Sequence, residues 1–290
     1  MRIPKALIRS LYDIQHQRVQ TGNRICAEIK ARLGQLPGKS EDELEVEAKA
    51  YLDAARSEYN RITDAFVLSQ PNKYLKVSFS DYAIITDAAM LLFVESYERQ
   101  LKQESDMTKV IAKVVEQHPM WDKFFKDVKG CGPLMSAVIL TEFDITKAKH
   151  ISGFWAYAGL DVAGDGRGRG RFKEHLVDRE YTDKDGKQQL KKGITFNPFL
   201  KTKLVGVLGG CLMKTKGEYK GVYDGYKHRL ENHPKHAEKS KGHRHNMAVR
   251  YMIKIFVQDL WLKWREVAGL PITAPYSEAK LGLKHDQDAA

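Results

Sequence analysis

The sequence predicts a mainly α-helical protein with a helical arm, a basic helical domain and a loose tail. Apolar side chains recur three and four residues apart through much of the first 118 residues, which is the period of an amphipathic helix. From Trp121 onward the helical segments become shorter, and turn signals and basic residues are more frequent. We therefore place the arm at 1–118, the basic domain at 119–275 and the tail at 276–290.

Three long helices are expected in the arm. The first carries an apolar stripe from Leu7 to Ile29. A turn at Leu36–Gly38 ends it, and Ser40 is a plausible N-cap for the second helix. A third helix is expected to begin at Ser80. The spacing fits a coiled coil or helical hairpin, and equally a plain helical bundle.

The basic domain is expected to contain short helices and one small insertion. TDKDGK at Thr182–Lys187 is a turn signal between two strand-like segments, which predicts a β-hairpin. The remaining expectations are a helix over 197–216, a polar loop over 219–241 and a last helix over 243–268.

The charge is distributed unevenly along the chain. Residues 1–120 contain 17 basic and 17 acidic residues, so the formal net charge of +11 lies entirely in residues 121–290. A basic half indicates a polyanionic partner, most often a nucleic acid, because neutralised phosphates release counterions. The alternative is ordinary charge for solubility.

The cysteines and hydropathy favour a cytoplasmic protein. Cys26, Cys131 and Cys211 are far apart and odd in number, which fits a reducing compartment better than a disulfide framework or a zinc site. The sequence contains no apolar run of 18 residues, so no membrane span is expected. The first residues lack the pattern of a signal peptide.

Lys129-Gly130-Cys131-Gly132-Pro133 is typical of the turn in a helix-hairpin-helix element. Glycine permits a close backbone approach, proline suits the first turn of a helix, and free amides at that helix start can hold a phosphate. We expect the flanking helices at Trp121–Val128 and Leu134–Thr141. The predicted phosphate contacts are Lys129, Gly130, Gly132 and Pro133; the alternative is a tight turn without a ligand.

Two further motifs follow this turn in order. They are FWAYAGLDV, beginning at Phe154, and KKGITFNPFLKTKLVGVLGGCL, beginning at Lys191. The ordered set of GCGP, YAGL and KKG resembles the C-terminal domain of the IS110/IS116/IS902 transposase family over residues 121–216. Members of that family place a nucleophilic serine in the loop after YAGL, and their first domain is RuvC-like with a metal-binding acidic residue.

Both halves of that recombinase site are absent from this sequence. The loop after YAGL is AGDGRGRGR, which has no serine, and the nearest serines are Ser136 on the apolar helix and Ser152, which precedes the YAGL helix. The first residues are predicted to be helical, with no candidate acidic strand. We therefore expect no enzyme activity, no metal and no cofactor.

The same domain is similar to the Nop domain of box C/D ribonucleoprotein scaffolds, and the whole plan resembles the Tas proteins of tandem interspaced guide RNA (TIGR) systems. That resemblance implies a ribonucleoprotein that binds a short guide RNA and recognises target DNA through base pairing. It corresponds to the kind without a nuclease, prokaryotic or phage-encoded. The apolar stripe of the arm would suit a homodimer.

Basic residues of the second half are the candidate nucleic-acid contacts. Glycine-spaced arginines can reach successive phosphates, a helix start can hold one, and a basic face of the last helix can extend the surface. Each set has the alternative of a solvated surface. The residues are Arg167, Arg169, Arg171, Lys191, Lys192, Asn197, Lys201, Lys203, His243, Arg244, Asn246, Arg250 and Lys254.

Two other functions stay open at this stage. A diverged IS110-type transposase or nuclease would need a divalent metal, but the histidines between His228 and His245 fit neither an HNH site nor a zinc site. A DNA-binding protein that uses the hairpin without RNA would purify without a discrete RNA.

Overall fold

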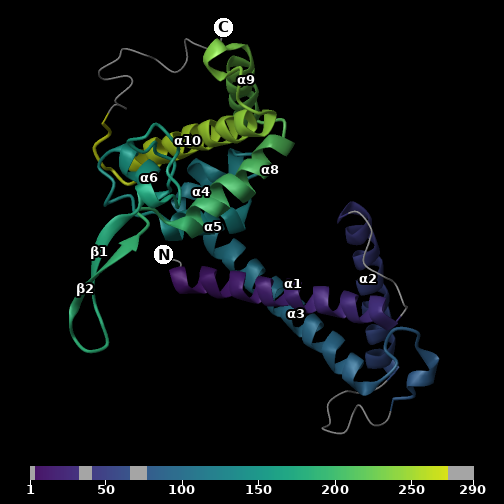
Figure 1. The fold of residues 1–290 in the computed structure, drawn as a ribbon. Helices are drawn as coiled ribbons and strands as arrows, with labels where there is room; N and C mark the ends of the chain where they lie inside the picture. Colours follow the sequence, from purple (N-terminus) through teal and green to yellow (C-terminus); the bar gives the residue numbers. More distant parts are fainter. Residues whose placement is uncertain (1–3, 33–40, 66–76, 274–290) are drawn as a thin grey trace. The chain divides into compact units, whose positions relative to one another are not determined.

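The computed structural model describes residues 4–32, 41–65 and 77–273. Within 41–65, side chains are described for residues 49–64. These residues are mainly α-helical with a small antiparallel sheet, which confirms the predicted fold class (Figure 1). The chain divides into two compact units. We call Ala6–Val110 the arm unit, and Ile111–Ala290 with Met1–Lys5 the basic unit. The division lies within a helix, eight residues before the position expected from the sequence.

The arm unit is built on the helices α1 (Lys5–Arg32), α2 (Glu41–Ala65) and α3 (Ala88–Glu116), of which α1 and α3 extend slightly beyond it. Their apolar stripes meet in one core, as the period predicts. The buried members of this core are Ile25, Ile29, Ala55, Ile62, Val77, Ile85, Met90, Leu91, Val94 and Tyr97. The turn expected at residues 36–40 lies outside the described residues.

The third helix begins later than Ser80, so that part of the prediction is wrong. Asp87 caps α3, because its carboxylate accepts a hydrogen bond from the amide of Met90. Residues 83–85 lie outside the helix, because the buried carboxylate of Glu58 accepts hydrogen bonds from the amides of Ala83, Ile84 and Ile85. This long-range contact with α2 leaves no local signal in the sequence.

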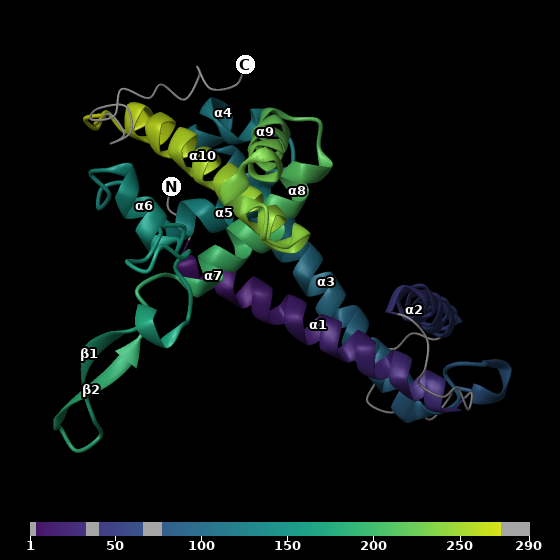
Figure 2. The same cartoon turned by 45° about the horizontal axis from the view of Figure 1, so that its top comes forward.

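The basic unit is organised around the long helix α10 (Lys241–Val267), which contacts α4, α6, α8 and α9 (Figure 2). Ser240 caps α10 through the amide of His243. Its core side includes Phe256, Leu260 and Trp261, all fully buried. The other helices of this unit are α4 (Pro119–Lys123), α5 (Pro133–Glu142), α6 (Ile151–Tyr157), α7 (Pro198–Lys201), α8 (Gly209–Lys214) and α9 (Glu218–Asn232), with short helical turns η3 (Phe125–Asp127), η4 (Lys173–His175) and η6 (Pro234–His236).

The segment expected to be a polar loop over 219–241 is largely helix α9, which corrects the prediction. Tyr219, Tyr223 and Leu230 are buried at helical spacing. Tyr219 lies edge-to-face against Phe256 of α10. The low hydropathy of the segment concealed a helix whose buried face is mostly tyrosine.

The helix-hairpin-helix region also differs from its prediction. The first helix is the short α4, which begins at Pro119 behind the cap His118, followed by η3. The backbone leaves the helical region at Phe124, whose ring packs against Phe125 and Phe256. The second helix, α5, lies where expected. The segment 197–216 is helical with a π-helical stretch η5 (Thr202–Leu208) between α7 and α8.

The predicted β-hairpin is present. Strands β1 (Val177–Thr182) and β2 (Gln188–Gly193) pair antiparallel. Asp183 holds the turn by accepting hydrogen bonds from the amides of Asp185 and Lys187, and Gly186 takes the positive φ that the turn requires. We call this two-stranded element the ribbon; Figure 1 shows it projecting from the rest of the basic unit.

The expected tail at 276–290 lies outside the described residues. Of the helices in the described ranges, none combines the length and apolar character that a membrane span needs.

Candidate functional site: cations around Asp161

Four predicted contact residues lie near Asp161, and one of them, Arg169, contacts its carboxylate directly. Arg169, Lys201, Arg250 and Lys254 surround Asp161, and we call these five residues the Asp161 cluster. They come from the Gly/Arg loop, from α7 and from α10, while Asp161 directly follows the YAGL motif at the end of α6. The fold thus brings together side chains that are up to 93 positions apart in the sequence.

Arg169 is the direct ion-pair partner of Asp161. Its guanidinium donates two hydrogen bonds to Asp161 Oδ2, at 3.0 and 2.7 Å. The backbone fixes this pair, because the amide of Arg169 donates to the carbonyl of Asp161 and a β-bridge joins Val162 to Gly168. The Gly/Arg loop is therefore an ordered turn in which Gly166 has a positive φ.

Arg250 is bound through backbone carbonyls instead of a carboxylate. Its Nη2 donates to the carbonyl oxygens of Gly159 and Asp161, at 3.3 and 3.2 Å. Gly168 lies directly against the guanidinium, since a Cβ at that position would be 2.8 Å from the Arg250 Cζ. This glycine makes room for the arginine.

Lys201 and Lys254 lie over aromatic rings. The Lys254 ammonium is 4.3 Å from the centroid of the Trp155 ring, and the Lys201 ammonium is 4.7 Å from that of Phe196. Lys201 also donates a hydrogen bond to the carbonyl of Arg169. Neither lysine forms an ion pair with a carboxylate in the described part of the chain.

The cluster carries more positive charge than its surroundings offset. Burial and then the neighbouring Arg250 lower the pKa of Lys201 to about 8, while Asp161 opposes the shift. The same causes lower the pKa of Lys254, and burial lowers that of Arg250. Cations whose pKa is lowered by their surroundings gain from the arrival of an anion.

A buried histidine supports the loop that carries Arg169. His175 Nδ1 accepts a hydrogen bond from the amide of Gly170, at 3.0 Å. Its Nε2 must then carry the proton and donate to Asp165 Oδ2, also at 3.0 Å. Arg167 and Arg171 are exposed on the same loop, and Arg167 reaches toward the ring of Phe172.

A second polar network sets the start of α7 and hence the position of Lys201. Asn197 caps α7 by accepting from the amide of Leu200, and its Nδ2 donates to Glu142 Oε2 and to the Tyr157 hydroxyl. The fully buried Glu142 carboxylate also pairs with Lys5, at 2.6 Å. Asn197 therefore positions α7 and is not an open phosphate contact.

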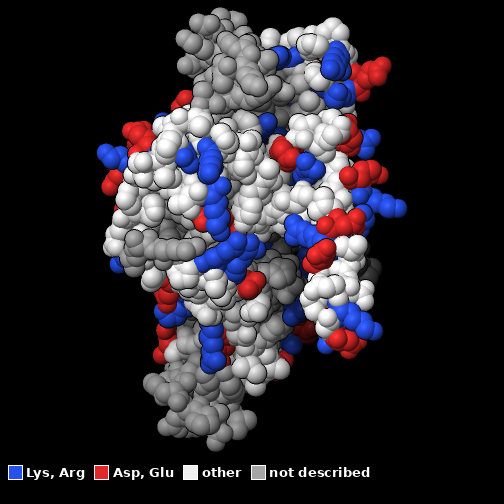
Figure 3. Space-filling model, turned by 90° about the vertical axis from the view of Figure 1, so that its left-hand side faces the viewer, with Lys and Arg blue, Asp and Glu red and all other residues white. Residues whose placement is uncertain are grey.

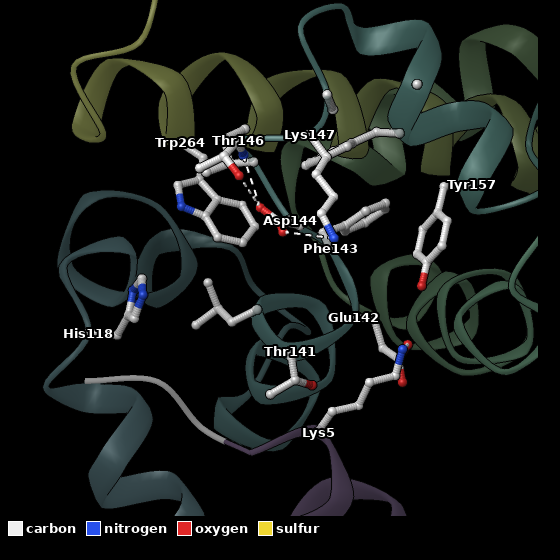
Figure 4. Close-up of a pocket in the computed structure, with 15 residues that line it drawn as sticks. Lys5, His118, Thr141, Glu142, Phe143, Asp144, Thr146, Lys147, Tyr157 and Trp264 are labelled. Carbon is white, nitrogen blue, oxygen red and sulfur yellow. Dashed lines mark hydrogen bonds and ion pairs between the residues drawn. The ribbon is translucent and has the colours of Figure 1, made fainter.

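This network forms one wall of a cavity of about 700 Å³ (Figure 4). Lys5, Glu142 and Tyr157 lie on one side of it, and His118 and Trp264 on the other. Burial lowers the pKa of His118, whose Nδ1 accepts a hydrogen bond from the amide of Met120. The cavity has both aromatic and charged walls, and its polar side is tied to α7.

The Gly130–Pro133 turn belongs to a different surface. Gly130 has a φ of 96° and lies against the backbone of Cys211, so this glycine serves packing against α8. Lys129 and Gly132 are exposed, and the Lys129 carbonyl accepts a hydrogen bond from Thr215. A cavity of about 440 Å³ lies beside Lys129, with acidic and basic residues in its wall.

The other predicted contacts are distributed over several places. Lys191 and Lys192 are exposed on β2, and Lys203 lies over the ring of Phe199. Arg244 donates to the carbonyls of residues 236, 237 and 239, so it holds the loop before α10. His243 and Asn246 are exposed near the start of α10.

Sequence reasoning missed the residues that give the cluster its character. Asp161 was not considered, although it directly follows the YAGL motif that the sequence analysis identified. Trp155 lies within the FWAYAGLDV motif and is half-buried beneath Lys254. Phe196 lies three residues after KKG, and its position between the lysines of this segment was the available signal.

Lysine and arginine side chains gather in the middle of the molecular face shown in Figure 3.

In the ranges that the structure covers, no three His, Cys, Asp or Glu side chains are placed to share a metal ion. No protein family, curated protein or solved structure gives a significant match to this chain.

Proposed function

We propose that this protein binds RNA through the Asp161 cluster and acts as a non-enzymatic, RNA-guided scaffold for recognising target DNA. The observation that carries the proposal is the charge of the cluster, in which four cations surround one carboxylate. A phosphate backbone supplies the missing negative charge. Such a contact holds the polynucleotide without reading its bases.

The chemistry of the cluster favours an extended polyanion. Arg169 and Arg250 present planar guanidinium groups, which suit phosphate oxygens, and Lys201 and Lys254 add point charges. Trp155 and Phe196 form apolar floors beneath the lysines. A chain of phosphates can contact several of these groups, whereas a single small anion contacts fewer.

The proposal of a guide RNA and a DNA target rests on the resemblance of the ordered motifs to those of the IS110 family and the Tas proteins. GCGP forms the turn before α5, YAGL ends α6 beside the cluster, and KKG ends β2. In the systems that these motifs resemble, a short guide RNA pairs with DNA, so the protein needs only to hold the backbone. We propose the same division of labour here, in a prokaryotic or phage-encoded ribonucleoprotein that is a homodimer.

The test is to express the full chain with its native flanking DNA, purify it and sequence the nucleic acid that comes with it. The double variant K201Q/K254Q removes two charges from the cluster. K109Q/K113Q removes two exposed lysines of α3 and is the matched control. We expect a discrete short RNA with wild type and control, and its loss from K201Q/K254Q.

The alternatives give different results. Protein that copurifies only with heterogeneous DNA would overturn the RNA proposal in favour of a DNA-backbone binder. Metal-dependent strand cleavage abolished by one carboxylate substitution would favour a diverged IS110-type transposase or nuclease. A discrete RNA that K201Q/K254Q retains would overturn the role of the cluster.

A further inference from the structure

The exposure of the ribbon is not explained by packing within the basic unit. Eleven of its twelve strand residues are exposed, with only Gly193 half-buried, so neither face is covered by the described residues. An isolated two-stranded hairpin is only marginally stable in water. Each strand has six residues and is therefore about 20 Å long.

The two faces of the ribbon differ in charge. The register pairs Arg179 with Lys191 and Tyr181 with Gln189 on one face, which has two cations and no carboxylate. The opposite face pairs Asp178 with Lys192 and Glu180 with Leu190, also from the register. We call the first one the basic face and the second the acidic face.

On the acidic face the lysine has its partner, whereas on the basic face two cations oppose each other. Lys192 forms an ion pair of 2.9 Å with Asp178. Arg179 and Lys191 are direct cross-strand partners of like charge, an arrangement that is unfavourable without an anion between them. In the described part of the chain neither of them forms an ion pair with a carboxylate.

Arg179 also connects the basic face with the Asp161 cluster. Its guanidinium leans over Gly193 and donates to the carbonyl of Ile194, at 2.6 Å. Ile194 is two residues before Phe196, on whose ring Lys201 lies. Two residues of backbone span at most about 7 Å, so Arg179 of the ribbon and Lys201 of the cluster contact positions of the same short segment.

We propose that the basic face of the ribbon is a second RNA-backbone contact, in which Arg179 and Lys191 hold phosphates of the same strand that occupies the Asp161 cluster. This inference rests on the proposed function and adds Arg179 to the interface. It also separates the neighbours Lys191 and Lys192. The first contacts RNA, and the second stays paired with Asp178.

The experiment uses full-length protein and one synthetic RNA, the copurified one, shortened from each end to a nested series of lengths. R179Q/K191Q removes the two cations of the basic face. K184Q/K192Q removes two cations from the turn and the acidic face of the same ribbon, so the net charge falls equally. We expect R179Q/K191Q to weaken binding of the longest RNA about tenfold, as expected for lost charge-assisted contacts, and K184Q/K192Q to weaken it far less.

RNA length supplies the second readout. Below the length that reaches the ribbon, R179Q/K191Q should bind as tightly as wild type. Equal losses for the two double variants at every length would show a general charge effect and overturn the inference. Duplex DNA is measured in parallel with the same variants, and a loss seen only with duplex DNA would overturn the assignment of RNA as the partner.

The same series includes K201Q/K254Q, so the two proposals fail differently. If this variant binds every RNA normally, the role of the Asp161 cluster in the proposed function is wrong. If it loses binding while R179Q/K191Q behaves like K184Q/K192Q, only the role of the ribbon is wrong. Circular dichroism of each variant checks that the fold is unchanged.

Discussion

The arm unit and the Asp161 cluster differ in how their half-buried charges are paired. In the arm unit, Arg18 pairs with Glu104 and Arg56 pairs with Glu98. The buried carboxylate of Glu95 is paired with Arg99. In the cluster, Asp161 has several cationic neighbours, of which Arg169 is its direct partner.

This difference distinguishes charged side chains that stabilise the fold from charged side chains that can bind a ligand. An ion pair inside a fold contributes to stability only when both partners are present, because an unpaired charge keeps its desolvation cost. A cluster with excess positive charge lowers the stability of the free protein, and the binding of an anion offsets this loss of stability. The sequence already shows the same contrast as a neutral first part and a basic second part.

The largest expected effect is that of D161N. Arg169 and Asp161 are each 24% exposed, so loss of the carboxylate should lower the free energy of unfolding by about 1–2 kcal/mol, between the values for exposed and buried pairs. RNA should bind more tightly, because the cluster becomes more positive. Thermal melts with and without RNA measure both effects. Lower affinity in D161N would mean that Asp161 orients the site and that its charge is secondary.

The second effect is a dependence of RNA affinity on pH. The pKa of Lys201 is about 8 in the free protein, so the ammonium is mostly protonated at pH 7 and mostly neutral at pH 9. If only protonated Lys201 binds phosphate, affinity should fall about tenfold between these values. K201R keeps its charge and should flatten this profile. An unchanged slope in K201R would assign the pH dependence to another group.

The lowered pKa of Lys201 makes stability depend on pH in the opposite direction to RNA affinity. Between about pH 8 and the ordinary lysine pKa near 10.4, the unfolded chain binds a proton at Lys201 that the folded chain does not. The contribution of Lys201 therefore makes the free protein more stable as the pH rises through this window. Denaturant titrations of wild type and K201R at two pH values isolate this contribution.

R18Q should affect only the arm unit. It leaves Glu104 without its guanidinium partner, and Glu104 is 15% exposed, so the expected loss of stability is about 1 kcal/mol. E104Q should restore part of that loss in the double variant, which a double-mutant cycle measures. RNA affinity should stay at its wild-type value, and a large fall would contradict the contrast between the two regions.

The sequence predicts the elements of this fold better than their boundaries. Helical periodicity locates α1 and α10, and TDKDGK locates the ribbon, because those signals are local. The start of α3 was wrong because it depends on Glu58, about 25 residues away, binding three amides. Helix α9 was missed because tyrosines supply most of its buried face.

The candidate site was predicted as a list of cations and not as an arrangement. Lys201, Arg250 and Lys254 were on that list, but so were Arg244, which holds the loop before α10, and Asn197, which caps α7. A sequence pattern identifies residues that carry charge. Which of these cations lie together depends on contacts across the fold, such as that of Arg250 with the carbonyl of Gly159.

The smallest expected effect is on the salt dependence of RNA binding. Each phosphate contact on a single strand contributes about −0.7 to the slope of log affinity against log salt concentration. K254Q should make this slope shallower by about that amount, because Lys254 forms no ion pair in the described residues that could replace the phosphate. K109Q, an exposed lysine of α3, is the single-charge control and should leave the slope unchanged. Equal slopes for K254Q and wild type would mean that the Lys254 ammonium stays over Trp155 when RNA is bound, and the phosphate contacts would then belong to Arg169, Lys201 and Arg250.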